Sequence, residues 1–267
     1  RFFLGMFAMI GALIFLGCPW RSLLRLAGGD GNAILGLLGL GTGIFVGILF
    51  LKKGFSLGRS YSQAKASGWI MPGLMIGLFF LLIFKVSFAE GGPIFFSAKG
   101  PGSMHAPIII SLIAGLAIGA LAQRSRFCTM GALRDVMLTR DFHLISGVLA
   151  LLVFAFATNL ILGQFNAGFE GQPVAHTNHL WNFLGMSLSG LAFALAGGCP
   201  GRQLFLSGEG DADAGVFVLG MIVGAGISHT FAMASSPKGV AAFGPIAVIV
   251  GLIFCLIIGF TMLQRAK

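Results

Sequence analysis

Long hydrophobic runs separated by short polar segments make up most of this chain. A helix needs about 20 residues, each adding about 1.5 Å, to cross the hydrocarbon core of a membrane. Several runs reach that length, and three others fall slightly short of it and stop beside a cysteine. The pattern therefore predicts an all-α, polytopic transmembrane helical bundle. The apolar runs are 2–17, 32–51, 70–89, 106–122, 143–165, 180–197, 214–235 and 240–263.

The three short runs, 2–17, 106–122 and 180–197, are the ones that end at a cysteine motif. A helix that stops inside the bilayer is typical of a broken or re-entrant element in a transporter. Backbone groups in hydrocarbon must be paired, so such a break is tolerated only where it lines water or a protein cavity. We therefore expect short broken or re-entrant helices around a central site.

Two of these motifs form an internal repeat. "GCPWRSLLRLAGGD" (17–30) and "GCPGRQLFLSGEGD" (198–211) share Gly, Cys, Pro, Arg, Leu, Gly and Asp at matching positions. The first copy follows an odd-numbered apolar run and the second an even-numbered one, so we expect inverted internal repeats that meet near the midplane. A more divergent third element, "RSRFCTMGALRD" (124–135), keeps the same plan. We expect one integral membrane transport domain over 1–267, with repeat-like units at about 1–51, 106–165 and 180–235.

Composition excludes a soluble globular protein. The chain is 57% hydrophobic and only 9% charged, whereas soluble domains carry roughly a quarter charged residues. Its formal charge is +9, but no nucleic-acid partner is expected because no soluble module presents a basic face. Contacts with lipid headgroups explain most of the excess of basic over acidic residues. An anionic substrate explains those basic residues that lie within an apolar run.

The two ends of the sequence carry expectations of their own. Cations gather on one side of the alternating runs, which predicts that both ends of this sequence face the cytoplasm. Because the sequence starts at Arg1 and not at methionine, we also expect further residues upstream.

The Gly-Cys-Pro-x-Arg motif combines features of an anion site. Glycine is expected to permit the helix break, and proline fits the first turn of the next helix. The cysteine then lies near a helix N-terminus, whose partial positive charge attracts anions and favours thiolate. An arginine three residues later strengthens both effects. The predicted substrate-binding residues are Gly17, Cys18, Pro19, Arg21, Arg126, Cys128, Gly198, Cys199, Pro200 and Arg202.

Other candidate chemistry is weaker. All four cysteines lie in or beside apolar runs, which favours free thiols over disulfides, and Cys255 is expected to be an apolar filler. The "HTNH" segment (176–179) lacks a third metal ligand, and no catalytic triad or phosphate loop is found. We therefore expect no metal, no cofactor and no enzymatic activity.

Glycines repeat along two of the runs and predict close helix packing. They stand at positions 36, 39, 43 and 47 of the second run and at 220, 224 and 226 of the seventh.

The three motifs "GCPWR", "RSRFCTMGALRD" and "LAGGCPGR", in that order and with helices between them, resemble the YeeE/YedE family of sulfur-transport membrane proteins. The resemblance implies an inner-membrane transporter with an hourglass-like helical fold. It implies that thiosulfate passes between the thiols of Cys18, Cys128 and Cys199 through S–H···S hydrogen bonds, and that a small cytoplasmic sulfur carrier of the TusA-like type is a partner. The extended first motif looks like the branch associated with selenium metabolism.

The prediction is therefore a multi-pass importer in the cell inner membrane for a small inorganic sulfur- or selenium-containing anion, with the three cysteines as a relay. Two alternatives stay open. One is a membrane thiol redox enzyme or relay that handles sulfur or selenium covalently. The other is a passive anion channel in which the arginines attract the anion and the cysteines only line the pore.

Overall fold

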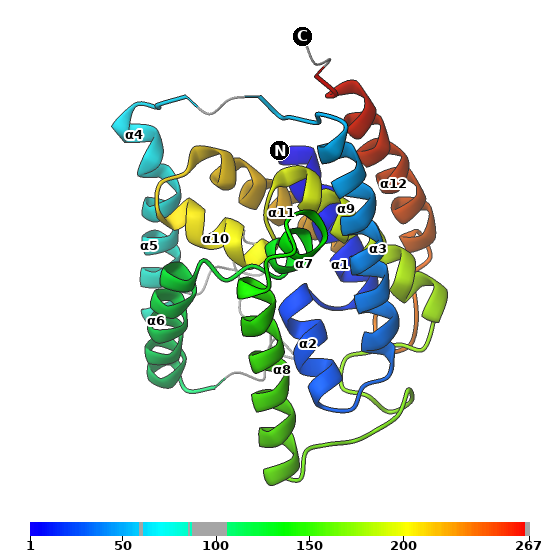
Figure 1. Cartoon of the computed structure of the whole chain (residues 1–267). Helices are drawn as coiled ribbons and strands as arrows, with labels where there is room; N and C mark the ends of the chain where they lie inside the picture. Colours follow the sequence, from blue (N-terminus) through cyan, green and yellow to red (C-terminus); the bar gives the residue numbers. More distant parts are fainter. Residues whose placement is uncertain (59–60, 85, 87–105, 265–267) are drawn as a thin grey trace.

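The computed structural model describes residues 1–58, 61–84, 86 and 106–264, and all regular elements in that part are helices (Figure 1). This confirms the all-α prediction. The helices are α1 (Phe2–Phe15), α2 (Pro19–Ala27), α3 (Asn32–Lys52), α4 (Lys65–Gly68), α5 (Ile70–Ile83), α6 (Ile108–Ser125), α7 (Thr129–Leu138), α8 (His143–Ile161), α9 (His179–Ala196), α10 (Pro200–Gly208), α11 (Ala212–Thr230) and α12 (Gly244–Thr261).

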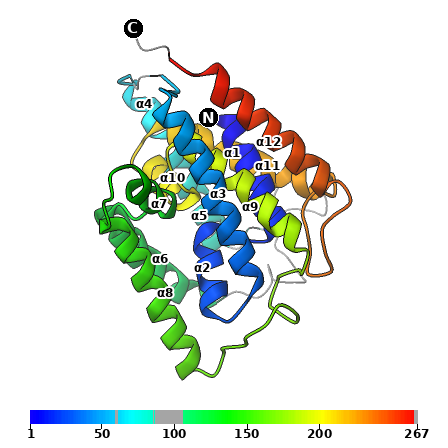
Figure 2. The same cartoon turned by 45° about the vertical axis from the view of Figure 1, so that its right-hand side comes forward.

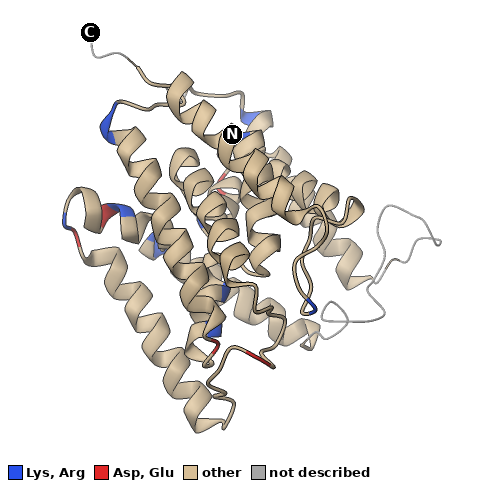
Figure 3. Ribbon diagram, turned by 90° about the vertical axis from the view of Figure 1, so that its right-hand side faces the viewer, with Lys and Arg blue, Asp and Glu red and all other residues tan. Residues whose placement is uncertain are grey.

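Eight helical stretches in the described residues are long and apolar enough to cross a membrane, as the eight apolar runs predict. Three of them consist of two helices in series: α1 with α2, α6 with α7, and α9 with α10. Figure 3 shows that the long helices are almost free of charged residues, which gather at helix ends, in loops and on the short helices. The chain is therefore a multi-pass membrane protein.

Helices α1 and α9 lie at the centre of the bundle. They pack against each other, while α3 packs on α9 and α11 packs on α1 (Figure 2). Helices α5, α6 and α8 lie at the periphery and leave most of their apolar side chains exposed, as lipid-facing helices do.

The contacts of α3 with α9 and of α11 with α1 depend on glycine, as the spacing predicts. A Cβ on Gly39 or Gly43 of α3 would overlap a backbone carbonyl of α9, and one on Gly220 would overlap a carbonyl of α1. Only hydrogen on these Cα atoms lets the backbones approach so closely. The prediction is wrong at Gly226, which faces open space.

The three helix breaks share one backbone conformation. Each first helix is followed by a left-handed residue, namely Leu16 (φ 65°), Arg126 (φ 53°) and Gly197 (φ 89°). The extended cysteine comes two residues later in each case. A left-handed residue closes the last helical turn by letting its amide reach back to an unpaired carbonyl.

The breaks correct one sequence-based expectation. Gly17 and Gly198 do not supply the left-handed conformation. Space restricts these two glycines only mildly: a Cβ on Gly198 would lie 2.9 Å from Nε2 of Gln203, the end of a flexible side chain, and one on Gly17 would lie 3.2 Å from the Phe15 ring.

Candidate functional site at the three helix breaks

Each motif cysteine is the N-cap residue of a half-helix. Cys18 precedes α2, Cys128 precedes α7 and Cys199 precedes α10. Pro19 and Pro200 occupy the first helical position, where the missing N–H has no helical partner to lose. The sequence therefore places the three thiols at helix N-termini, as expected from the motif.

Two of the thiols meet in the fold. The sulfur of Cys128 accepts hydrogen bonds from the amide of Gly131 at 3.3 Å and from the amide of Cys199 at 3.4 Å. Both residues are buried, and all four cysteines of the chain are free thiols. Residues 71 positions apart thus form one sulfur pair between α7 and α10.

Cys18 is half-buried and lines a cavity of about 130 Å³. Ala8, Ala12 and Met221 contribute to its apolar wall, and Pro200 extends it to the start of α10. One water molecule takes about 30 Å³ in the liquid, so the cavity has room for a small inorganic anion. The third thiol therefore lies in a cavity that reaches the residue next to Cys199.

An aromatic cluster joins the three breaks. The Trp20 ring on α2 lies 5.4 Å from the ring of Phe127, before α7, and 5.9 Å from that of Phe205 on α10, measured between centroids. A Cβ on Gly201 would lie 2.8 Å from the indole. This explains why the residue after the motif proline is tryptophan in one copy and glycine in the other: Trp20 fills the space that Gly201 leaves free.

The three arginines of the predicted site differ in burial. Arg202 is half-buried, and its Nη1 lies 3.8 Å from the carboxylate of Glu209. Arg21 and Arg126 are exposed, and Arg126 ends α6 on the far side of the break from Cys128. Of the three arginines, Arg202 is the one that is half-buried, and it lies three residues after Cys199 on α10.

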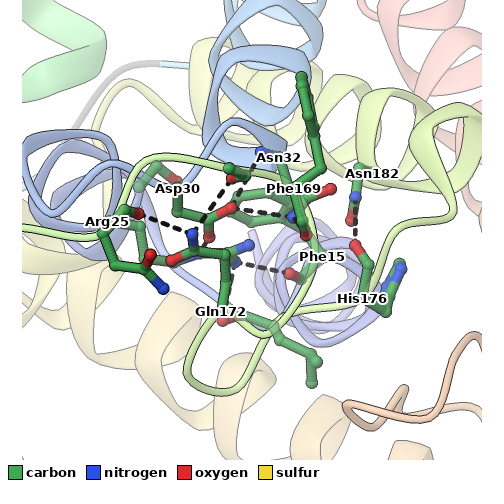
Figure 4. A network of polar contacts seen from close by, with 12 residues as sticks. Phe15, Arg25, Asp30, Asn32, Phe169, Gln172, His176 and Asn182 are labelled. Carbon is green, nitrogen blue, oxygen red and sulfur yellow. Dashed lines mark hydrogen bonds and ion pairs between the residues drawn. The ribbon is translucent and has the colours of Figure 1, made fainter.

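A polar network closes the C-terminal end of α1 (Figure 4). Arg25 donates to the carboxylate of Asp30 at 2.6 Å and to the carbonyl of Phe15 at 3.0 Å. Asp30 also accepts from the amide and the side chain of Asn32, both at 2.9 Å. The last carbonyls of a helix have no partner within it, so a buried charge pair completes the end of α1 directly before Cys18.

His176 completes a second carbonyl of the same helix end. Its Nε2 lies 2.7 Å from the carbonyl of Ile14, and its Nδ1 accepts from the amide of Asn178 at 3.3 Å. One nitrogen therefore donates and the other accepts, which is the pattern of neutral imidazole. Burial lowers the pKa of His176, and the charges of Arg25 and His179 act in the same direction.

Sequence reasoning did not find several of these residues. Trp20 lies within the motif "GCPWR", and its position between the cysteine and the arginine could have marked it as a site residue. Arg25 and Asp30 are visible in the sequence only as parts of the first motif copy, and His176 only as part of the "HTNH" segment. No cluster of metal-ligating side chains occurs among the described residues.

Comparison with known families identifies the family of this chain. The profile of a family described as "Sulphur transport" matches residues 124–262, more than half of the chain. This segment includes the Cys128–Cys199 pair and α7 to α12. The chain belongs to the Sulphur transport family.

Two relatives are similar over part of this length. "Thiosulfate transporter TsuA" of Spirochaeta thermophila is 34% identical over 101 residues, which are 37% of this chain and 29% of the relative. The protein of the same name from Escherichia coli is 27% identical over 107 residues, which are 40% of this chain and 30% of the relative. The aligned segments thus span about 30% of the length of these curated relatives.

Proposed function

We propose that this member of the Sulphur transport family imports a small sulfur- or selenium-containing anion of the thiosulfate type across the cell inner membrane. The observation that carries the proposal is the sulfur pair of Cys128 and Cys199 at two helix N-termini, with Cys18 in the adjoining cavity. The names of the two relatives support thiosulfate as the first substrate to test.

The proposed mechanism is a non-covalent relay. The positive ends of α2, α7 and α10 attract the anion, and Cys18, Cys128 and Cys199 pass it along by weak hydrogen bonds. Weak bonds suit conduction, because a site that bound the anion tightly would not release it. No metal, cofactor or chemical conversion is needed.

The packing of the two motif copies supports inverted repeats as part of this proposal. Helix α3 packs on α9, and its counterpart α11 packs on α1. The units of about 1–51 and 180–235 would then each contribute one half-helix to the site, with the 106–165 unit adding α7. A TusA-like sulfur carrier is the proposed cytoplasmic acceptor.

Uptake of labelled thiosulfate by cells expressing single variants tests the relay. Cys128→Ala and Cys199→Ala are expected to reduce uptake to the level of cells without the protein. Cys255→Ala is the matched control, because Cys255 is equally buried but lies in α12 outside the motifs. Full uptake by both motif variants would refute the relay.

Two further readouts separate the alternatives. A sulfur-sized mass increase on Cys128 or Cys199 after exposure to substrate would instead indicate a covalent thiol enzyme. Anion conductance that survives loss of all three motif thiols but disappears in Arg202→Ala would instead indicate a passive channel.

A further inference from the structure

The indole of Trp20 lies where the three half-helices meet. It packs on the ring of Phe127 at 5.4 Å and on that of Phe205 at 5.9 Å, measured between centroids. A third side of the indole faces Gly201, where a Cβ would lie 2.8 Å from the indole atom Cζ2. Trp20 and Gly201 each follow a motif cysteine by two residues, and Phe127 directly precedes the third motif cysteine. One side chain therefore connects the segments next to all three motif thiols.

Contacts with the long helices place the half-helices in two separate groups. Helices α2 and α7 pack on α3 and α8, whereas α10 packs on α11. Helices of nine or ten residues are not stable alone, so their positions depend on tertiary contacts. The hydrogen bond from the amide of Cys199 to the sulfur of Cys128 links α10 to α7, and the indole of Trp20 links α2 to α10. The distance from Cys18 to the sulfur pair therefore depends on Trp20.

The indole fits this place by its size and not by hydrogen bonding. Its Nε1 is buried and has no hydrogen-bond partner in the described part of the protein. A buried donor without a partner is unfavourable, and phenylalanine would avoid that loss but lacks the second ring. Ordinary van der Waals contact begins at 3.4 Å, so the indole leaves no room for a Cβ at Gly201. Trp20 and Gly201 therefore form a matched pair between α2 and α10.

We propose that Trp20 is the positioning residue of the thiol relay, an inference that rests on the proposed function. Its indole, seated on Gly201, holds Cys18 at a fixed distance from Cys128 and Cys199, so that the anion can pass from the first thiol to the sulfur pair. Among the described residues, Trp20 does not line the cavity of Cys18. A poorer fit of the indole should therefore slow the transfer of the anion without weakening its first binding.

The test perturbs the matched pair in two opposite ways and measures initial rates of labelled thiosulfate uptake by the full chain in proteoliposomes. Gly201→Ala adds a methyl group 2.8 Å from the indole, so α2 and α10 must separate by about 0.6 Å to restore a contact of 3.4 Å. Trp20→Phe instead leaves a gap. Because transfer depends steeply on geometry, each variant should lower the maximal rate about tenfold and change KM by less than about twofold.

The double variant separates positioning from a general loss of structure. Phenylalanine lacks the indole atoms Cζ2 and Cη2 that would meet the new methyl group, so Trp20→Phe combined with Gly201→Ala should recover most of the lost rate. Gly208→Ala is the matched control, because it lies at the end of α10 where a Cβ meets no other atom. It should keep the rate of the unsubstituted protein.

The outcomes distinguish this inference from the proposed function. An unaltered maximal rate in Gly201→Ala, a double variant as slow as the single ones, or a rise in KM with no change in maximal rate would overturn the positioning role alone. Absence of thiosulfate uptake by the unsubstituted protein would refute the proposed function itself.

Discussion

The buried ion pair of Arg25 and Asp30 makes a quantitative prediction about stability. The two side chains are only 7% and 4% exposed, and their atoms lie 2.6 Å apart. Asp30→Asn keeps the shape, so Asn32 retains an acceptor, but an amide N–H₂ then faces the donor of Arg25. Removing one partner of a buried pair costs about 3–5 kcal/mol, because the other charge is left without compensation.

Unfolding of the detergent-solubilised protein by a denaturing detergent, followed by tryptophan fluorescence, measures this loss. Arg25→Met should lose a similar amount, because it leaves Asp30 charged and Phe15 without its donor. The double variant should be more stable than the sum of the two losses predicts, by about 2–3 kcal/mol.

A surface pair provides the control. Arg134 and Asp135 lie 2.8 Å apart with side chains 36% and 21% exposed. Asp135→Asn should therefore cost less than about 1 kcal/mol. Equal losses for Asp30→Asn and Asp135→Asn, or additive losses in the double variant, would show that the Arg25–Asp30 pair is hydrated in the folded protein.

Three further predictions concern backbone and pH. Gly197→Ala should lower the unfolding free energy by about 1–2 kcal/mol, because alanine is strained in the left-handed backbone conformation of this residue. A Cβ at this position meets no other atom, so no steric clash adds to the loss. Gly43→Ala should lower it by about 1–3 kcal/mol, since the added methyl group forces α3 away from α9. Gly41→Ala, also in open space on α3, is the control for both and should be neutral or stabilising in the same unfolding assay; a loss equal to theirs would contradict both explanations. Because burial lowers the pKa of His176, the unfolded chain binds the proton more readily, and stability should fall as the pH drops below about 6.5. His176→Gln should weaken that dependence in thermal unfolding measured from pH 8 to pH 5, and an unaltered pH profile would show that His176 does not contribute to it.

Much of the architecture could be predicted because membrane insertion limits the alternatives. Backbone in hydrocarbon must form helices, so apolar run length alone gave the eight spans, and the motif cysteines marked the three breaks to within a few residues. The left-handed residues could not be predicted in the same way. Leu16 and Arg126 adopt a conformation that glycine would take more easily, because the packing of both half-helices imposes it.

The sequence by itself determined the helical class, the spans, the family and the position of three thiols at helix starts, because these follow from local composition and order. The tertiary structure alone decided that Cys128 and Cys199 meet, that Arg202 is half-buried while Arg21 and Arg126 are exposed, and that Trp20 packs against Phe127 and Phe205. These facts depend on contacts between residues far apart in the chain, and the local pattern of hydrophobic and polar residues does not show which distant residues will be in contact.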